Sequence, residues 1–336
     1  MSKALGAATF RTPAEAYDRY IGRYGGELAR ALIAAAGVRP GRRALDVGCG
    51  PGALTTELVA ALGAANVAAV DPSVPFAEAC RRRHPGVRVE LGSAEALPFA
   101  DASFDHAFAQ LVVNFMTDPH AGVRELRRVT RGGGTVAAAV WDYGGEMTLL
   151  RRFWDAAVSL DPSAAELDEG RSMPFCTPGE LGDLWRSAGL AAVSVGPVLA
   201  TAQYDDFEDL WEPLERGVAP SGAYVAALAP AQRAALKREL RRRLGVGTSR
   251  SGSRHAPGSP SAGRPEPGRG DGPVHTERFR MTIAGSQGAS LNFAWDPAPA
   301  VDCSLEGGGS LIESWQFRRG KDVVMVFKKL GPGWRS

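Results

Sequence analysis

The chain has 336 residues and a formal net charge of +2, with 39 basic and 37 acidic residues. This length accommodates one large α/β domain, alone or with a smaller appendage. Because charges of both signs are interspersed through most of the chain, composition gives no electrostatic basis for a nucleic acid or an anionic membrane as a partner. A small or neutral substrate fits this balance better.

The cysteines and the N-terminal sequence predict a cytoplasmic protein. The four cysteines are scattered without the short spacing of a zinc knuckle or a thioredoxin-type motif, so we expect a reducing compartment and no metal site. The first residues lack the apolar stretch of a signal peptide, and no later run approaches the length that spans a bilayer.

Hydrophobic periodicity predicts alternating helices and strands over the first 200 residues. Helical spacing over 13–36, interrupted by Gly25 and Gly26, predicts two short helices. An apolar run over 43–47 that ends in glycines predicts the first parallel strand. Helices are then expected at 53–62, 75–83, 121–130, 147–159 and 178–188, and strands at 67–71, 87–91, 103–109, 135–141 and 191–199. This order predicts a doubly wound, mostly parallel α/β sheet with helices on both faces and a ligand at the carboxyl ends of its strands.

A glycine-rich turn, ALDVGCGPG, follows the first strand. Gly48, Gly50 and Gly52 let the backbone approach a ligand closely, and the free amides at the helix start can bind a carboxylate. Asp46, at the strand end, can hold the turn or accept from an ammonium group. Because Gly48, Gly50 and Ala53 also fit the GxGxxA pattern of dinucleotide-binding proteins, the turn alone leaves the cofactor open.

The later motifs distinguish between cofactors. Asp71 and Pro72 end the second strand, where an acidic side chain meets an adenosine ribose in NAD and in S-adenosylmethionine (SAM) proteins alike. The stretches GSAEALPF, DASFD, AQLVVNFM and RVTRGGG then follow in order between residues 92 and 134. Together these motifs resemble the small-molecule branch of the class I SAM-dependent methyltransferases, and the resemblance covers about residues 14–244.

The resemblance implies SAM as the cofactor and assigns its contacts. Asp71 is expected to bind both ribose hydroxyls, and the backbone amides of Ala94 and Glu95 to contact adenine. Ser93 stands where relatives often have an aspartate that accepts from the adenine amino group, so it offers a weaker, uncharged acceptor. Gln110, at the end of the fourth strand, is expected at the methionine end of the cofactor, and the alternative is that it caps the strand by bonding backbone.

Aromatic residues are candidates for the lid and the acceptor pocket. Tyr17, Arg19 and Tyr20 resemble the N-terminal lid of these enzymes, where an aromatic face can stabilise a sulfonium. The alternative is that both tyrosines only pack their helix onto the domain. A second aromatic set either lines the acceptor pocket or belongs to the core: Trp141, Trp154, Phe175 and Trp211.

The resemblance implies transfer of a methyl group from SAM to an oxygen, nitrogen or carbon of a small, partly apolar metabolite, with S-adenosylhomocysteine (SAH) as the product. Since positioning alone can account for roughly 7 to 11 kcal/mol of such a barrier, no catalytic residue is assigned. A SAM-sensing or scaffold protein without turnover is the alternative. The acceptor and the oligomeric state are left open.

The expected organisation is a methyltransferase domain over 1–244, a disordered Gly/Pro/Ser/Arg-rich segment over 245–273 and a short β-rich tail over 274–336. Within the domain, lid helices are expected at 14–36, the cofactor core at 40–200 and accessory helices at 204–244.

The C-terminal part departs from the relatives. Their final antiparallel strand, which follows soon after the helix ending near Leu244, is absent here. Codons for 254–263 can encode Ala-Arg-Ala-Trp-Val-Ala-Val-Arg-Gly when read from the third base, so the tail is interpreted either as the product of a frameshift or as a fused β unit over 277–329. A frameshifted sheet has an exposed edge unless a tail strand such as 322–327 fills the gap.

Overall fold

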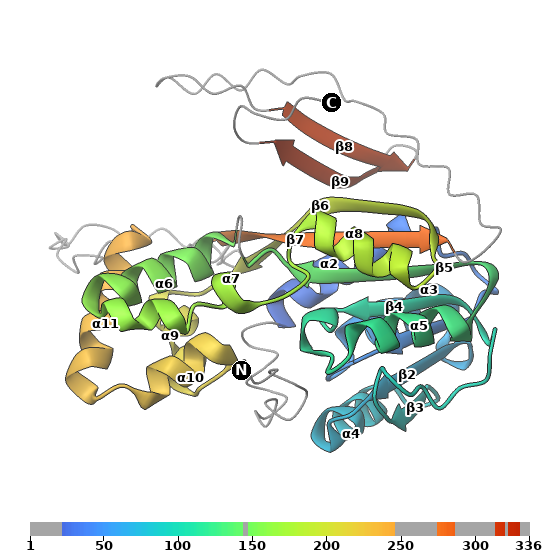
Figure 1. Cartoon of the computed structure of the whole chain (residues 1–336), viewed down its shortest axis with the longest axis horizontal. Coiled ribbons are helices and arrows are strands. Elements are labelled where there is room, and N and C mark those ends of the chain that lie inside the picture. The colour runs from blue at the N-terminus through green and yellow to red at the C-terminus, as the bar shows by residue number, and fades with distance from the viewer. Residues whose placement is uncertain (1–21, 144–146, 246–273, 286–312, 320–321, 330–336) are drawn as a thin grey trace, which may run out of the picture.

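A computed structural model of the chain describes residues 22–143, 147–245, 274–285, 313–319 and 322–329. Its centre is a seven-stranded sheet in the order β3-β2-β1-β4-β5-β7-β6 (Figure 1). The strands are β1 (Ala44–Val47), β2 (Val67–Asp71), β3 (Arg88–Leu91), β4 (Phe104–Gln110), β5 (Thr130–Trp141), β6 (Ala191–Gln203) and β7 (Val274–Gly285). Strands β1 to β5 pair in parallel, and β7 runs antiparallel to both β5 and β6.

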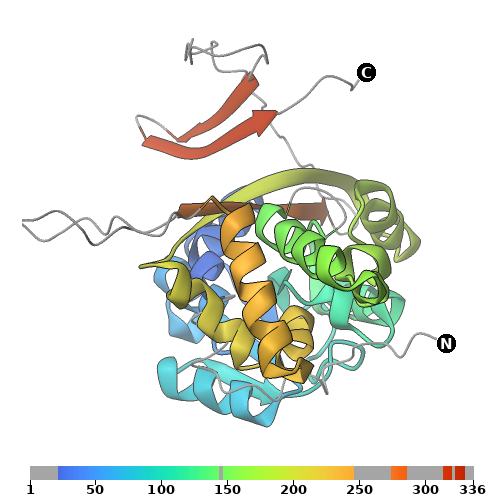
Figure 2. The same ribbon diagram turned by 90° about the vertical axis from the view of Figure 1, so that its left-hand side faces the viewer.

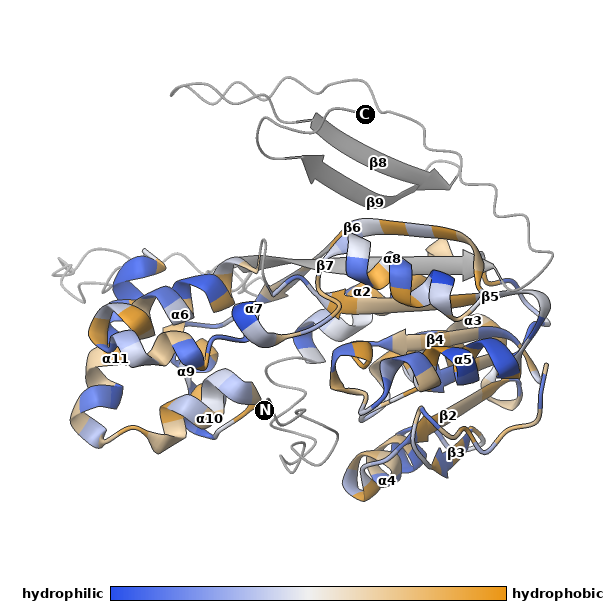
Figure 3. Cartoon of the chain, in the orientation of Figure 1, coloured by the Kyte–Doolittle hydropathy of each residue, from blue (hydrophilic) through white to orange (hydrophobic). Residues whose placement is uncertain are grey.

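Helices cover both faces of the sheet because the central strands β1 and β2 are buried at every position and are mostly apolar toward both faces. Leu45 and Ala68 belong to one buried cluster with α5 (Pro119–Val129) and α8 (Pro178–Ser187). Their strand neighbours Ala44 and Ala69 belong to the other cluster. That second cluster includes α2 (Gly22–Ala35), α3 (Ala53–Leu62) and α4 (Val74–Arg83). Figure 3 shows the apolar colours concentrated along the central strands, as expected for a sheet buried on both faces.

The accessory helices gather beyond one end of the sheet (Figures 1 and 2). They are α6 (Thr148–Leu160), α7 (Glu169–Ser172), α9 (Phe207–Glu215), α10 (Ala219–Ala227) and α11 (Pro230–Arg243). Trp154 and Trp211 are at most 1% exposed and belong to the core that these helices share with the sheet. No helix in the described part of the chain is long and apolar enough to cross a membrane.

The doubly wound fold class predicted from the sequence is confirmed, and the predicted break at Gly25 and Gly26 is wrong. Helix α2 runs through both glycines. A Cβ atom built at Gly25 would lie only 2.9 Å from the Cβ of Ala53 on α3. Gly25 therefore permits two helices to pack closely, which offsets the cost of about 1 kcal/mol for glycine inside a helix. The short helix α7 was not predicted, whereas α10 lies within 204–244, where accessory helices were expected.

The strand between β5 and β6 comes from the C-terminal part of the chain. The gap is filled by β7, not by residues 322–327, which were offered as the example of a filling strand. Those residues lie in β9 (Asp322–Lys329), which pairs with β8 (Glu313–Arg319) in a separate two-stranded sheet. Apart from Gly245, the segment expected to be disordered lies outside the described residues.

A proline in β7 tests whether this strand completes the sheet. Ile283 pairs with Ala137 of β5 and Ser194 of β6. Ile283→Pro therefore removes one backbone amide from a strand that pairs with a neighbouring strand on each side. We expect the free energy of unfolding to fall by about 1 to 3 kcal/mol in denaturant titrations. The matched control, Val326→Pro in β9, should leave the main transition unchanged. Equal effects of the two prolines would contradict the placement of β7.

Candidate cofactor-binding site

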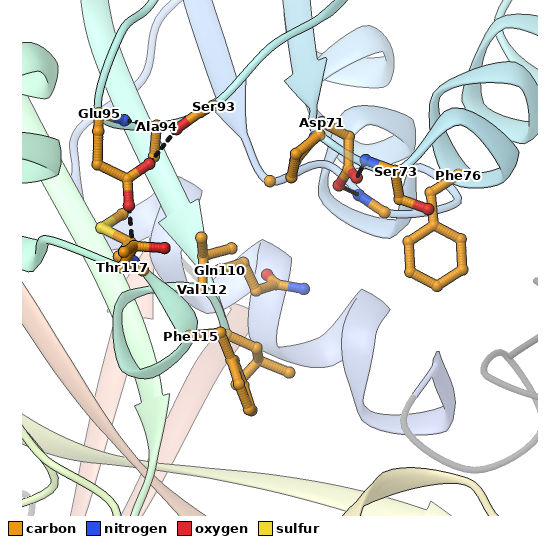
Figure 4. Close-up of a pocket in the computed structure, with 15 residues that line it drawn as sticks. Asp71, Ser73, Phe76, Ser93, Ala94, Glu95, Gln110, Val112, Phe115 and Thr117 are labelled. Atoms are coloured by element: carbon orange, nitrogen blue, oxygen red, sulfur yellow. Dashed lines mark hydrogen bonds between the residues drawn. The ribbon is translucent and has the colours of Figure 1, made fainter. Parts of the chain in front are cut away.

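A cavity of about 230 Å³ lies at the carboxyl ends of β1, β2, β3 and β4 (Figure 4). Eight of the predicted cofactor residues line it: Gly48, Gly50, Asp71, Pro72, Ser93, Ala94, Glu95 and Gln110. The remaining lining residues were not predicted: Ser73, Phe76, Leu111, Val112, Phe115, Met116 and Thr117. Most of these are apolar residues that follow β4, in the stretch AQLVVNFM, which contributed to the family resemblance but was given no cofactor contact beyond Gln110.

The glycine turn needs glycine for different reasons at its three positions. Gly48, Gly50 and Gly52 all have positive φ angles, between +53° and +102°, which other residues rarely adopt. A Cβ at Gly48 would lie 2.4 Å from a methyl carbon of Val112, whereas a Cβ at Gly50 would meet nothing within 4 Å. Gly52 does not line the cavity; a Cβ there would lie 2.8 Å from Nε2 of His84. The turn is therefore open to the cavity at Gly50 and closed against the protein at Gly52.

The carboxylate of Asp71 joins the glycine turn to the end of β2. Its Oδ2 accepts from the amide of Gly50 and its Oδ1 from the amide of Ser73, each at 2.8 Å. Burial raises the pKa of Asp71, although the two backbone amides oppose this shift. Since each carboxylate oxygen can accept more than one hydrogen bond, Asp71 retains acceptor capacity toward the cavity.

Ser93 is engaged with Glu95 on another side of the cavity. The Ser93 hydroxyl donates to the Glu95 carboxylate, and the Glu95 amide donates to Ser93 Oγ at 3.2 Å. Oε1 of Glu95 also accepts from the amide of Thr117 at 2.7 Å. Burial would raise the pKa of Glu95, but these hydrogen bonds outweigh burial and lower it. A negative charge therefore lies beside Ser93, on the carboxylate of Glu95. From the sequence, Glu95 was expected to contribute only its backbone amide.

Gln110 links the cavity to helix α2. Its Nε2 donates to the carbonyl oxygen of Gly25 at 3.1 Å. Its Oε1 is buried and has no hydrogen-bond partner within the described part of the chain. In Figure 4 the side chain extends from the end of β4 between the group around Asp71 and the group around Glu95.

Other predicted residues lie away from the cavity or outside the described chain. Asp46 is 1% exposed and does not line the cavity; it accepts from the hydroxyl of Thr55 at 2.6 Å. It therefore holds the start of α3 rather than facing a ligand directly. The candidate lid residues lie outside the described residues and stay predictions: Tyr17, Arg19 and Tyr20.

The second aromatic set belongs to the core. Trp141, Trp154 and Trp211 are at most 5% exposed and fall in the buried cluster that includes α2, α3 and α4. Phe175 packs against the other cluster. None of the four lines the cavity.

Comparison with known proteins identifies the family. The family model described as "Methyltransferase domain" matches residues 45–138. A malonyl-[acyl-carrier protein] O-methyltransferase of Erwinia pyrifoliae is 30% identical over 241 residues, which cover 65% of this chain and 89% of the relative. The chain belongs to the class I SAM-dependent methyltransferase family. The cofactor of this family is SAM.

Further relatives define the extent of the match. The same enzyme from Pseudescherichia vulneris is 33% identical over 161 residues, covering 47% of this methyltransferase chain and 62% of the relative. The chain spans 34 to 62% of the length of the first three curated relatives. Among solved structures, Haemonchus contortus phosphoethanolamine N-methyltransferase 2, in complex with phosphomonomethylethanolamine and SAH, shares the fold with a TM-score of 0.51. Its identity is 16%, and the match covers 85% of this chain and 61% of that one.

The buried carboxyl of Asp46 gives a pH-dependent prediction. Burial raises its pKa to about 7, above the value of about 3.9 for a solvated aspartate. Between these values the folded chain keeps a proton that the unfolded chain releases, so this group makes the fold less stable as pH rises from about 4 to about 7. Asp46→Asn cannot ionise and should escape this loss.

Denaturant titrations of both proteins across this pH range measure the difference. We expect the unfolding free energy of Asp46→Asn, minus that of the wild type, to increase with pH and then level off above about pH 7. A difference that stays constant or decreases would show that the pKa of Asp46 is not raised in the folded chain.

Proposed function

We propose that the chain is an enzyme that transfers a methyl group from SAM to an oxygen, nitrogen or carbon of a small, partly apolar metabolite. The observation that carries the proposal is the convergence of the open glycine turn, Asp71, Glu95 and Gln110 on one cavity. This cavity lies at the carboxyl ends of parallel strands, where doubly wound folds bind ligands.

The residues of the cavity fit the parts of SAM. At Gly50, space is open beside the turn, so a ligand can approach the backbone closely. The free acceptor capacity of Asp71 suits the two ribose hydroxyls. Ser93 and Glu95 suit the adenine edge, since an ionised carboxylate accepts from an amino group more strongly than a hydroxyl does. When bound, SAM supplies a methyl group on a positively charged sulfur. Attack by the acceptor forms the new bond to the methyl carbon and breaks the carbon–sulfur bond, with the electron pair leaving on the sulfur of SAH.

The chain's contribution to this step is positioning. The apolar wall formed by Leu111, Val112 and Phe115 suits a partly apolar acceptor. No side chain is assigned as a base, because displacement at a sulfonium needs the acceptor held at attack geometry. Relatives named as malonyl-[acyl-carrier protein] O-methyltransferases make a malonyl oxygen one acceptor to include in assays.

Binding and turnover can be measured separately. We expect SAM and SAH to bind in calorimetry, and SAH to be released when SAM is incubated with one member of a panel of oxygen, nitrogen and carbon acceptors. Tight binding of both ligands with no product from any acceptor would favour the SAM-sensing or scaffold alternative. Binding of NADH but not of SAM would contradict the proposal.

Replacing Asp71 tests the placement of the ribose. Asp71→Ala removes the acceptor for the ribose hydroxyls and releases the amides of Gly50 and Ser73, so SAH binding should weaken by about 2 to 3 kcal/mol. The matched control is Glu90→Ala, one strand away, because Glu90 pairs with Arg88 and does not line the cavity. Its dissociation constant should equal that of the wild type. An unchanged constant for Asp71→Ala would mean that the cofactor lies elsewhere.

A further inference from the structure

Helix α2 is joined to the cavity by a hydrogen bond that the proposed function leaves unexplained. The carbonyl oxygen of Gly25 accepts a hydrogen bond from Nε2 of Gln110 at 3.1 Å. A carbonyl oxygen has two lone pairs, so Gly25 can accept this bond and keep its place in the helix.

This bond determines which end of the Gln110 amide is free. A backbone carbonyl can only accept, so the group that faces Gly25 must be the NH₂ end of the carboxamide. Oε1 is therefore turned away from Gly25, and it is buried without a partner within the described residues. Leaving a buried acceptor unsatisfied is destabilising. Because Gln110 lines the cavity, a hydrogen-bond donor on a bound ligand is the natural partner.

The close approach of α2 depends on glycine at position 25. A Cβ there would lie 2.9 Å from the Cβ of Ala53 at the start of α3, and 3.8 Å from Nε2 of Gln110. At the neighbouring Gly26, a Cβ would make only ordinary contacts, at 3.5 Å from Arg30 and 3.6 Å from Glu57. The position of the Gly25 carbonyl is thus set by direct packing of α2 against the helix that follows the glycine turn.

We propose that Gly25 is a positioning residue for the cofactor site: its carbonyl oxygen holds Gln110 in the one orientation in which Oε1 accepts from the ammonium group at the methionine end of SAM. This inference rests on the proposed function, since it assigns one contact of the same cofactor. The reverse orientation would present NH₂ to the ammonium group, and two donors do not pair. Helix α2 therefore selects the charge that the site accepts.

The test compares the affinities of SAH and of the SAH analogue that lacks only the amino group, measured by calorimetry. Wild type should prefer SAH by at least about tenfold, as expected for a hydrogen bond to a charged group. Gly25→Ala should lose most of this preference while binding the analogue within about twofold of wild type. Gly26→Ala, the matched control on the same helix, should keep the full preference. Gly25→Ala combined with Ala53→Gly removes the clash and should restore it.

Gln110→Glu tests the same idea without altering the packing of α2. The variant keeps an acceptor for the ammonium group but presents a carboxylate oxygen, in place of NH₂, to the Gly25 carbonyl. If Gly25 positions this side chain, the preference for SAH should fall at pH 8 although the new acceptor is charged; a stronger preference would overturn the inference.

The outcomes separate the inference from the proposed function. If Gly25→Ala weakened the binding of SAH and of the analogue equally, or left the preference for SAH unchanged, the positioning role alone would be overturned. Failure of wild type to bind either ligand would overturn the proposed function, and the inference with it.

Discussion

The candidate cofactor site depends on the carboxylate of Asp71, which holds two loops from neighbouring strands in one arrangement. One oxygen receives the amide of Gly50 in the glycine turn, and the other receives the amide of Ser73 before α4. Burying this group raises its pKa, which means that the fold stabilises the charged form less well than water does. A bound ligand with hydroxyl donors would offset part of that cost. The same side chain therefore shapes the cavity and offers a hydrogen-bond acceptor at its edge.

Local patterns predicted most of the elements because each element carries its own signal. The apolar run of β2 ends in Asp71, and the glycine turn follows β1, so both could be placed from sequence alone. Contacts between distant segments could not. The continuity of α2 through Gly25 depends on Ala53 of α3, and the filling of the sheet by β7 depends on pairing with β5 and β6. In both cases the contacting segments are far apart in the sequence.

The same limit applies to the site. Ser93 was predicted as a weak neutral acceptor, yet its hydroxyl donates to Glu95. Glu95 in turn binds the amide of Thr117, in the segment before α5. The charge on this side of the cavity could not be assigned from the motif, because a side chain two residues away in a loop can point in either direction. The apolar lining after β4 was missed because periodicity does not distinguish a buried core residue from a cavity wall.

The central claim is that this cavity binds SAM with its ribose on Asp71 and its adenine beside Ser93 and Glu95. A crystal structure of the chain grown with SAH tests it most directly. We expect density for SAH in this cavity, with both ribose hydroxyls about 3 Å from the Asp71 carboxylate. SAH bound at another place, or an empty cavity at saturating SAH, would contradict it.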